Sequence, residues 1–249
     1  MFNSSDELYT GSKYLALNPD WHEEASKYKT GLVLEMIKKI EPGPRLIVDV
    51  GCGAGAILSE LGKHLDGQTQ LAGYDISPDA IKMAMPKTTS NLQFHLDDYT
   101  RSEHSKADLI LVIDVAEHVD DIYSFLRRLR DKGLNFIFHI PLDMSCRTLL
   151  KPHTLLQQRT GVGHIHYFTE EVVLWMLADT GYEVQHCIYT KPEVDLIKPQ
   201  SLKQWAKKLL RRISYGFNKK LSVKLWGNYS MLIWAKPTIK KTDENTLAL

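Results

Sequence analysis

Five short segments of the chain have the pattern of strands, and two of them, residues 46–50 and 109–113, are nearly continuous apolar runs. The five segments span residues 46–50, 71–74, 92–95, 109–113 and 135–140. Short continuous apolar runs are typical of strands that are buried on both faces, as in a parallel sheet. We therefore predict that these strands form the centre of the fold.

Helical patterns occupy the intervals between the runs. We expect helices within residues 21–40, 57–64, 77–85, 120–132 and 169–180. Two further strands are expected late in the chain, at residues 182–189 and 229–235, whereas the pattern between residues 141 and 163 is loose. Strands that alternate with helices predict βαβ units, hence an α/β fold with a mostly parallel sheet and helices on both faces.

Glycines mark the turn after the first strand. Residues 49–56 read DVGCGAGA, so a buried strand leads directly into a helix. Glycine lets the backbone approach a ligand closely, and a helix N-terminus suits a nucleotide-like cofactor. The pattern also fits the dinucleotide fingerprint, which requires an acidic residue about 20 positions further on. Asp75 occupies that place, so the glycines alone leave both cofactor classes open.

Asp49 distinguishes the two classes of cofactor. It places a carboxylate at the end of a buried strand, where it would repel a pyrophosphate. A cofactor that carries an ammonium and a sulfonium group would be attracted, because opposite charges at close range in a partly dry site are stabilising. Asp49 therefore favours S-adenosylmethionine over NAD.

The chain resembles the class I S-adenosylmethionine-dependent methyltransferases over residues 46–235, which implies a Rossmann-like fold. In that family the loop at residues 49–55 holds the methionine part of the cofactor. The residues that the resemblance assigns to this role are Asp49, Gly51, Cys52, Gly53 and Gly55.

The same resemblance implies contacts to the rest of the cofactor. Asp75 would hold the ribose hydroxyls and Ile76 would pack on the adenine. Asp98 would lie near the adenine amino group, with Asp97 as the alternative, and Asp114 is a further candidate cofactor contact. Each of these aspartates has a simpler interpretation, since Asp commonly caps helices or binds loop amides after a strand.

Two segments are similar to a subgroup that includes the ubiquinone-biosynthesis O-methyltransferases. Residues 113–119 read IDVAEHV, and residues 164–169 read HIHYFT before a helix. The family's sheet has seven strands and ends in an antiparallel hairpin, which the two late strands match. The resemblance therefore implies methyl transfer, with a hydroxyl as the expected acceptor.

Histidines are the candidate catalytic bases. A hydroxyl acceptor loses its proton as the new bond forms, which requires a base with a pKa near neutrality. His118 and His166 are our candidates, although a single imidazole near apolar residues more often serves packing. No third ligand is evident beside His164 and His166, so we expect no metal.

Bulk properties limit the class of protein. The 249 residues carry a formal net charge of +1, with 43% hydrophobic and 24% charged residues, as in an ordinary globular protein. The three cysteines form no metal-ligand spacing, which fits a reducing compartment. We find neither a signal peptide nor an apolar run long enough to span a membrane. We therefore expect a cytoplasmic protein.

The expected domain organisation has three parts. Residues 1–44 form a helical lid, in which Tyr9, Tyr14, Trp21 and His22 supply aromatic surface. Residues 45–237 form the methyltransferase domain, and residues 238–249 form a polar tail.

A basic insertion is expected at about residues 197–225, where lysines and arginines occur without any acidic residue. Leu202, Trp205, Leu209 and Ile213 would share one helical face. A helix docked on the sheet with a solvated cationic face is the simpler interpretation. A membrane interface, an acidic partner and RNA are the alternatives.

Four functional hypotheses follow. The first is methylation of a hydroxyl of a small molecule or glycan, and the second is an RNA methyltransferase that uses the basic insertion. The segment after the fourth strand lacks the Pro-Pro-aromatic run of adenine-N6 enzymes, so nucleic acid is not the expected partner. A binding module without turnover and an NAD(P)-dependent oxidoreductase are the other two.

Overall fold

The computed structural model describes residues 1–249 except for 1–25, 197–198 and 239–249. Its centre is a seven-stranded sheet in the order β3-β2-β1-β4-β5-β7-β6. The strands are β1 (Leu46–Val50), β2 (Gln70–Asp75), β3 (Leu92–Leu96), β4 (Ala107–Ile113), β5 (Gly133–Leu142), β6 (Tyr182–Thr190) and β7 (Tyr229–Pro237). The neighbours β3, β2, β1, β4 and β5 pair in parallel, whereas β7 lies antiparallel between β5 and β6. The predicted Rossmann-like fold with a late antiparallel hairpin is confirmed.

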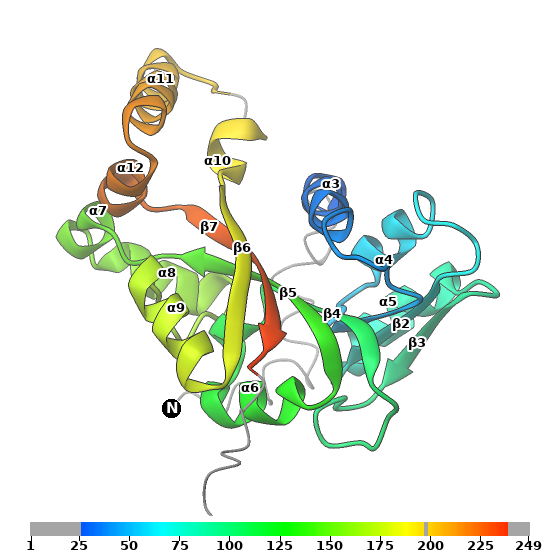
Figure 1. Ribbon diagram of the computed structural model, residues 1–249. Helices are drawn as coiled ribbons and strands as arrows, with labels where there is room; N and C mark the ends of the chain where they lie inside the picture. The colour runs from blue at the N-terminus through cyan, green and yellow to red at the C-terminus, as the bar shows by residue number, and fades with distance from the viewer. Residues whose placement is uncertain (1–25, 197–198, 239–249) are drawn as a thin grey trace, which may run out of the picture.

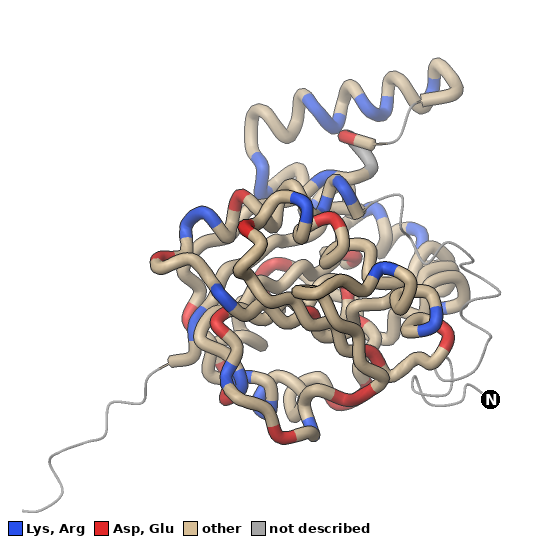
Figure 2. The backbone as a smooth tube through the Cα atoms, turned by 90° about the vertical axis from the view of Figure 1, so that its right-hand side faces the viewer, with Lys and Arg blue, Asp and Glu red and all other residues tan. Residues whose placement is uncertain are grey.

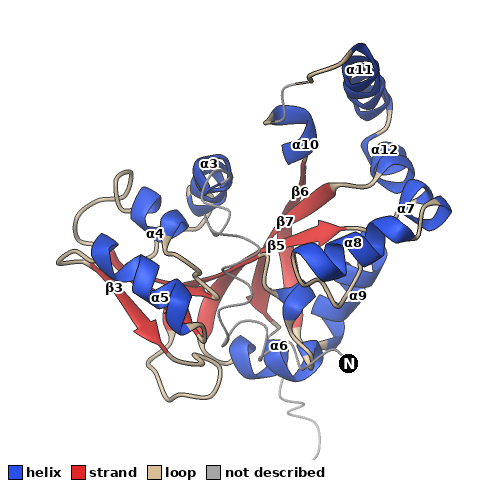
Figure 3. Ribbon diagram, turned by 180° about the vertical axis from the view of Figure 1, so that it is seen from behind, coloured by secondary structure: helices blue, strands red, loops and turns tan. Residues whose placement is uncertain are grey.

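Helices cover both faces of the sheet (Figures 1 and 3). One face packs against α3 (Ser26–Ile37), α4 (Ala56–Leu61) and α5 (Pro78–Ala84), and the other packs against α6 (Ile122–Arg130) and α9 (Glu170–Asp179). The two hydrophobic cores lie between the sheet and these helix layers. This arrangement explains the continuous apolar runs, because the central strands are buried from both sides.

Short elements complete the chain between β2 and β6. They are η2 (Met85–Lys87), η3 (Ala116–His118), α7 (Cys146–Leu150) and α8 (His153–Gly161). The sequence did not predict α7 and α8. No residue of α8 is buried, so this helix has no apolar face from which a period could be recognised.

Thr169 begins α9 as predicted, since its side chain accepts a hydrogen bond from the Val172 amide. Gly181 follows the end of this helix with φ 87°, a left-handed conformation that glycine adopts without strain. The helix therefore stops where β6 must begin.

Three helices connect β6 to β7, namely α10 (Pro192–Asp195), α11 (Leu202–Phe217) and α12 (Lys219–Trp226), and the predicted basic insertion corresponds to α11 and α12. The apolar residues expected to dock on the sheet are instead exposed, with Leu202 at 83% and Trp205 at 55%. Arg211, expected on a solvated face, is buried. Lys and Arg recur along α11, which projects from the body of the molecule (Figure 2).

No helix in the described part of the chain is both long and apolar enough to cross a bilayer. The aromatic residues of the predicted lid lie outside the described residues, as does all but one residue of the predicted tail.

Candidate functional site

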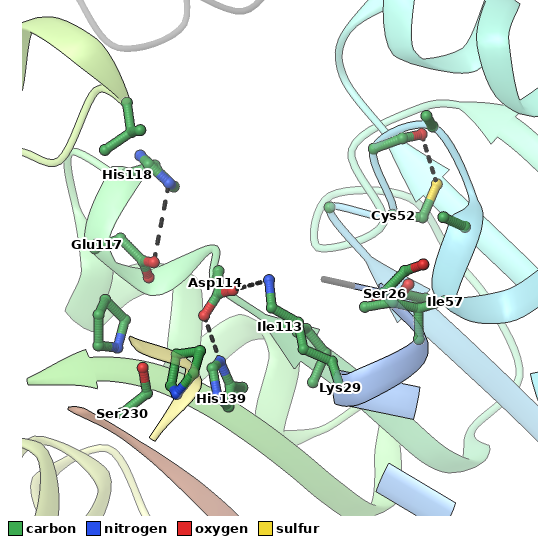
Figure 4. Close-up of a pocket in the computed structure, with 18 of the residues that line it drawn as sticks. Ser26, Lys29, Cys52, Ile57, Ile113, Asp114, Glu117, His118, His139 and Ser230 are labelled. Carbon is green, nitrogen blue, oxygen red and sulfur yellow. Dashed lines mark hydrogen bonds and ion pairs between the residues drawn. The ribbon is translucent and has the colours of Figure 1, made fainter. Parts of the chain in front are cut away.

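A cavity of ≈ 490 Å³ lies at the carboxyl ends of β1 and β4. Strand order reverses between these two strands, and ligands of open α/β sheets bind at such a reversal. The lining comes from the loops after β1 and β4, from β5, from α3 and from the segment around α8. Figure 4 shows Cys52 and Ile57 on one side of the cavity, Glu117 and His118 on the other, and Asp114 between them.

The glycine loop has a backbone that only glycine adopts easily. Gly51, Gly53 and Gly55 have φ values of 76°, 54° and 75°. A Cβ on Gly51 would lie 2.5 Å from the Val115 side chain, and one on Gly55 would lie 2.5 Å from Phe94. The loop therefore keeps its bare backbone directed at the cavity for both conformational and steric reasons.

Asp49 is the buried charge of this loop. Its side chain lines the cavity, the residue is 2% exposed, and its Oδ1 accepts no hydrogen bond from any described residue. Burial raises the pKa of Asp49 to about 7, with Asp75 adding to the rise and Lys29 opposing it. An unsatisfied buried carboxylate is costly, so a ligand ammonium group fits this position.

Asp75 stands at the end of β2, next to the glycine loop. Its Oδ2 accepts a hydrogen bond from the Gly53 amide and its Oδ1 accepts one from the Ser77 amide, both at 2.8 Å. Burial raises the pKa of Asp75, while these amide bonds oppose the rise. Ile76 is 39% exposed and offers apolar surface beside the carboxylate.

Asp98 is bonded within its own loop. Its Oδ1 accepts hydrogen bonds from the Thr100 amide and hydroxyl, and its Oδ2 lies 2.9 Å from Arg101 Nε. Asp97 accepts a hydrogen bond from the Ser102 hydroxyl. Neither carboxylate lines the cavity, so both lie further from it than the glycine loop does.

Asp114 is held between a lysine and a histidine of the protein. Lys29 Nζ lies 2.5 Å from its Oδ2, and His139 Nδ1 lies 2.5 Å from its Oδ1 (Figure 4). His139 also bonds through Nε2 to the Thr190 hydroxyl. Burial acts to raise the pKa of Asp114, but His139 and Lys29 outweigh it and hold that pKa far below its usual range. Both oxygens of Asp114 are thus engaged by the protein.

A second polar group faces the cavity from the side opposite the glycine loop. Glu117 is fully buried, and neither of its carboxylate oxygens accepts a hydrogen bond from a described residue. His118 Nε2 and His164 Nε2 each lie 3.9 Å from Glu117 Oε1. Burial raises the pKa of Glu117 well above its usual value, and Asp114 adds to the rise.

His166, our other candidate base, bonds to the backbone of the loop after β4. Its imidazole is not among the cavity-lining side chains, and its Nε2 bonds at 2.8 Å to the Val119 carbonyl. Its backbone amide and that of Ile165 donate to the Glu117 carbonyl. His166 therefore ties the segment after α8 to the loop after β4.

The structure brings only part of the predicted site to the cavity. The predicted residues that line it are Asp49, Gly51, Cys52, Gly53, Asp114 and His118, whereas Gly55, Asp75, Ile76, Asp98 and His166 lie outside the lining. Burial raises the pKa of the Cys52 thiol well above its usual value, which makes it a space-filling group rather than a nucleophile.

The sequence analysis did not assign Lys29, Glu117 or His139 to the site, and it weighed His164 only as a metal ligand. His139 carried a recognisable signal, because it is a polar residue within the apolar run of β5. Lys29 carried none, since a lysine on an amphipathic helix is expected in solvent. Glu117 and His164 become partners only through the fold.

Solved structures resemble the fold at low sequence identity. Magnesium protoporphyrin IX methyltransferase of Synechocystis PCC 6803, solved with bound SAH, has a TM-score of 0.55 at 16% identity, over 87% of this chain and 83% of that one. A chain from the complex of the Haloferax volcanii Trm112 methyltransferase activator with a methyltransferase has a TM-score of 0.65 at 15% identity, over 95% and 98%.

Ajmaline N-methyltransferase of Rauvolfia serpentina is 31% identical over 117 residues. The match covers 42% of this chain and 40% of that protein, so the aligned part is less than half of its length. Residues 21–187, more than half of this chain, match a family described as a methyltransferase domain. The fold and this match define a protein that carries a methyltransferase domain. The chain belongs to the methyltransferase domain family.

Proposed function

We propose that this enzyme transfers the methyl group of S-adenosylmethionine to a hydroxyl of a small molecule or glycan. The observation that carries the proposal is that the two sides of the cavity present different polar groups. A buried carboxylate with an unsatisfied oxygen, Asp49, lies on the side of the glycine loop, and an acid with two imidazoles lies on the other. The first side suits a cationic amino-acid group, and the second suits an oxygen acceptor that must lose a proton.

The cofactor side follows from the residues around β1 and β2. Asp49 accepts a hydrogen bond from the ammonium group, which satisfies its Oδ1 and offsets the cost of its burial. Asp75 receives the ribose hydroxyls, since each of its oxygens has a lone pair beyond the one used by a backbone amide. Ile76 covers the adenine, and Asp98 stays our candidate for its amino group.

When bound, the cofactor supplies a methyl group activated by a sulfonium. The new O–C bond forms as the S–C bond breaks, the electron pair of the S–C bond stays on sulfur, and the hydroxyl proton leaves. The chain has to align the acceptor with the methyl group, exclude water and remove this proton. Glu117, His118 and His164 are the groups at hand for the last task.

The choice of oxygen over nitrogen rests on two features of this chain. Residues 113–119 are similar to the subgroup that includes ubiquinone-biosynthesis O-methyltransferases, and imidazoles line the acceptor side. The relative from Rauvolfia serpentina is an N-methyltransferase, so nitrogen is the competing acceptor. A neutral amine would not require the acid and two imidazoles for its activation.

The test is incubation of the purified protein with labelled methyl donor and paired acceptors that differ only in a hydroxyl or an amine. We expect S-adenosylhomocysteine and labelled ether with the hydroxyl series. Asp49→Asn serves as the control that keeps the side-chain shape but not the charge, and it should lose turnover. Label that appears only on the amine series would overturn the oxygen assignment.

We also propose a binding partner for the basic insertion. We propose that a lipid surface suits α11 better than RNA, because Leu202 and Phe217 stand exposed among its cations. Binding to RNA with no binding to anionic vesicles would reverse this preference.

A further inference from the structure

The loop after β4 and the segment after α8 place three metal-ligating side chains together. Single ligand atoms of Glu117, His118 and His164 all lie within 4.8 Å of one another. We propose that these three residues bind one divalent transition-metal ion at the acceptor side of the cavity. The proposal that an ion binds here depends only on the geometry of the three residues. The proposal that the ion acts on an acceptor hydroxyl rests on the proposed function.

The buried acid is the first argument for an ion. Glu117 is fully buried and both of its oxygens lack a hydrogen-bond donor among the described residues. A carboxyl group without hydrogen-bond partners in this environment costs free energy. A cation between the acid and the imidazoles would satisfy it and would keep it ionised.

The Nδ1 nitrogen of each histidine already has a polar partner, which orients the imidazole ring. His164 Nδ1 lies 2.7 Å from Asp143 Oδ2, and His118 Nδ1 lies 3.2 Å from the Gly163 carbonyl oxygen. Metal-binding histidines commonly donate one ring N–H to a carboxylate or a backbone carbonyl, which fixes the other nitrogen as the ligand. In both residues it is Nε2 that lies toward Glu117.

The distances require only a small adjustment. Each Nε2 is 3.9 Å from Glu117 Oε1, and the two imidazole centroids are 5.0 Å apart. Ligand atoms about 2.1 Å from a tetrahedral ion lie roughly 3.4 Å apart, so each Nε2 would have to approach Glu117 Oε1 by about 0.5 Å. The ligand nitrogens of the two histidines, which lie within 4.8 Å of each other, would have to approach as well. We expect side-chain rotations to provide this closure.

The ligand set selects the kind of ion. Two imidazoles with one carboxylate suit zinc, iron, cobalt or nickel, whereas magnesium and calcium prefer all-oxygen sites. Three protein ligands leave at least one coordination position, and the ligands line the cavity, so this position faces the acceptor.

An acceptor hydroxyl bound to the ion would lose its proton more easily, because a divalent cation lowers the pKa of a coordinated oxygen. The proton would pass to solvent water. The imidazoles would then act as ligands and not as bases, and the alkoxide oxygen would take the methyl group as described above.

The test measures metal binding without methyl donor or acceptor. Full-length protein freed of metal by a chelator is titrated with Zn²⁺ by calorimetry, and with Co²⁺ by visible absorption. We expect one equivalent of either ion, and no displacement by Mg²⁺. Glu117→Gln and His164→Gln should each weaken Zn²⁺ binding at least tenfold.

Asp143→Asn provides a variant outside the ligand set. It should weaken Zn²⁺ binding by about 10- to 100-fold, through the loss of the carboxylate that orients His164. His153→Gln is the matched control for His164→Gln: His153 lies exposed on the neighbouring α8, so its replacement should leave Zn²⁺ binding unchanged. Circular dichroism checks that each variant is folded.

Zn²⁺ binding that is absent, or that is unaffected by the Glu117, His164 and Asp143 substitutions, would overturn the site. Hydroxyl methylation that persists in metal-free protein would overturn its catalytic action and leave the proposed function intact. Metal binding with methylation of amines alone would leave the site intact and reject the oxygen acceptor.

Discussion

At the scale of single residues, two carboxylates at the ends of neighbouring strands have opposite surroundings. Asp114 is bonded through both oxygens to Lys29 and His139, so it stays ionised without a ligand. Asp49 keeps Oδ1 unsatisfied, and burial with the nearby Asp75 raises its pKa to about 7. Asp49 is therefore the carboxylate that we propose binds a ligand cation, and on this proposal its ionisation accompanies cofactor binding.

Cofactor affinity should depend on pH through Asp49. Only the ionised carboxylate binds the ammonium group, so a pKa of about 7 means that affinity rises as the pH increases through 7. We expect the calorimetric Kd of S-adenosylhomocysteine to be about tenfold weaker at pH 6 than at pH 8, in proportion to the ionised fraction.

Two controls accompany this titration. 5′-Methylthioadenosine lacks the ammonium group and should bind with a Kd that changes little over the same range. Asp49→Asn should remove the pH dependence for S-adenosylhomocysteine and weaken its binding at pH 8. An equal slope for both ligands would show that a group other than Asp49 titrates.

At the scale of elements, the insertion is anchored by one buried arginine. Arg211 of α11 is 1% exposed, donates a hydrogen bond to the Gly227 carbonyl and lies with its guanidinium carbon 4.9 Å from the centroid of the Tyr229 ring. These contacts connect α11 to the end of α12 and the start of β7. They explain how a helix whose apolar residues are largely exposed keeps a defined position.

Replacement of Arg211 tests this anchor. Arg211→Met should lower the free energy of unfolding by about 2–3 kcal/mol, because a charged hydrogen bond is lost and the Gly227 carbonyl loses its donor. Arg212→Met is the matched control: Arg212 is exposed, and we expect a change within about 0.5 kcal/mol. Urea denaturation measures both, and equal effects would contradict the anchoring role.

At the scale of the whole molecule, segments from distant parts of the chain meet at the cavity. The lining comes from α3, from the loops after β1 and β4, from β5 and from the segment around α8. A ligand in this cavity contacts several elements that assemble only in the folded chain. Ligand binding and global stability are therefore coupled.

The cofactor class should be visible in thermal unfolding. S-Adenosylhomocysteine at 100 times its Kd should stabilise the fold by about 2.7 kcal/mol. For a chain of this size that raises Tm by roughly 5–10 °C. NADH should leave Tm unchanged, because its pyrophosphate would meet the Asp49 carboxylate. A shift with NADH and none with S-adenosylhomocysteine would contradict the cofactor assignment.

Local patterns in the sequence predicted all seven strands, the glycine turn and the position of Asp49. Apolar runs identify strands buried on both sides, and glycine with Asp at a strand end is a short-range signal. The helix α8 escaped prediction because it has no buried face. The lid residues before Ser26 lie outside the described part of the chain, and their role stays a prediction.

The sequence alone thus determined the class of fold, the glycine turn and the place of a carboxylate at the end of β1. Only the tertiary structure decided which side chains meet across the cavity. Lys29 pairs with Asp114 across 85 positions of the chain, and Glu117 reaches His164 through the docking of two separate loops. No local pattern encodes such pairs, because their proximity depends on strand order and helix packing.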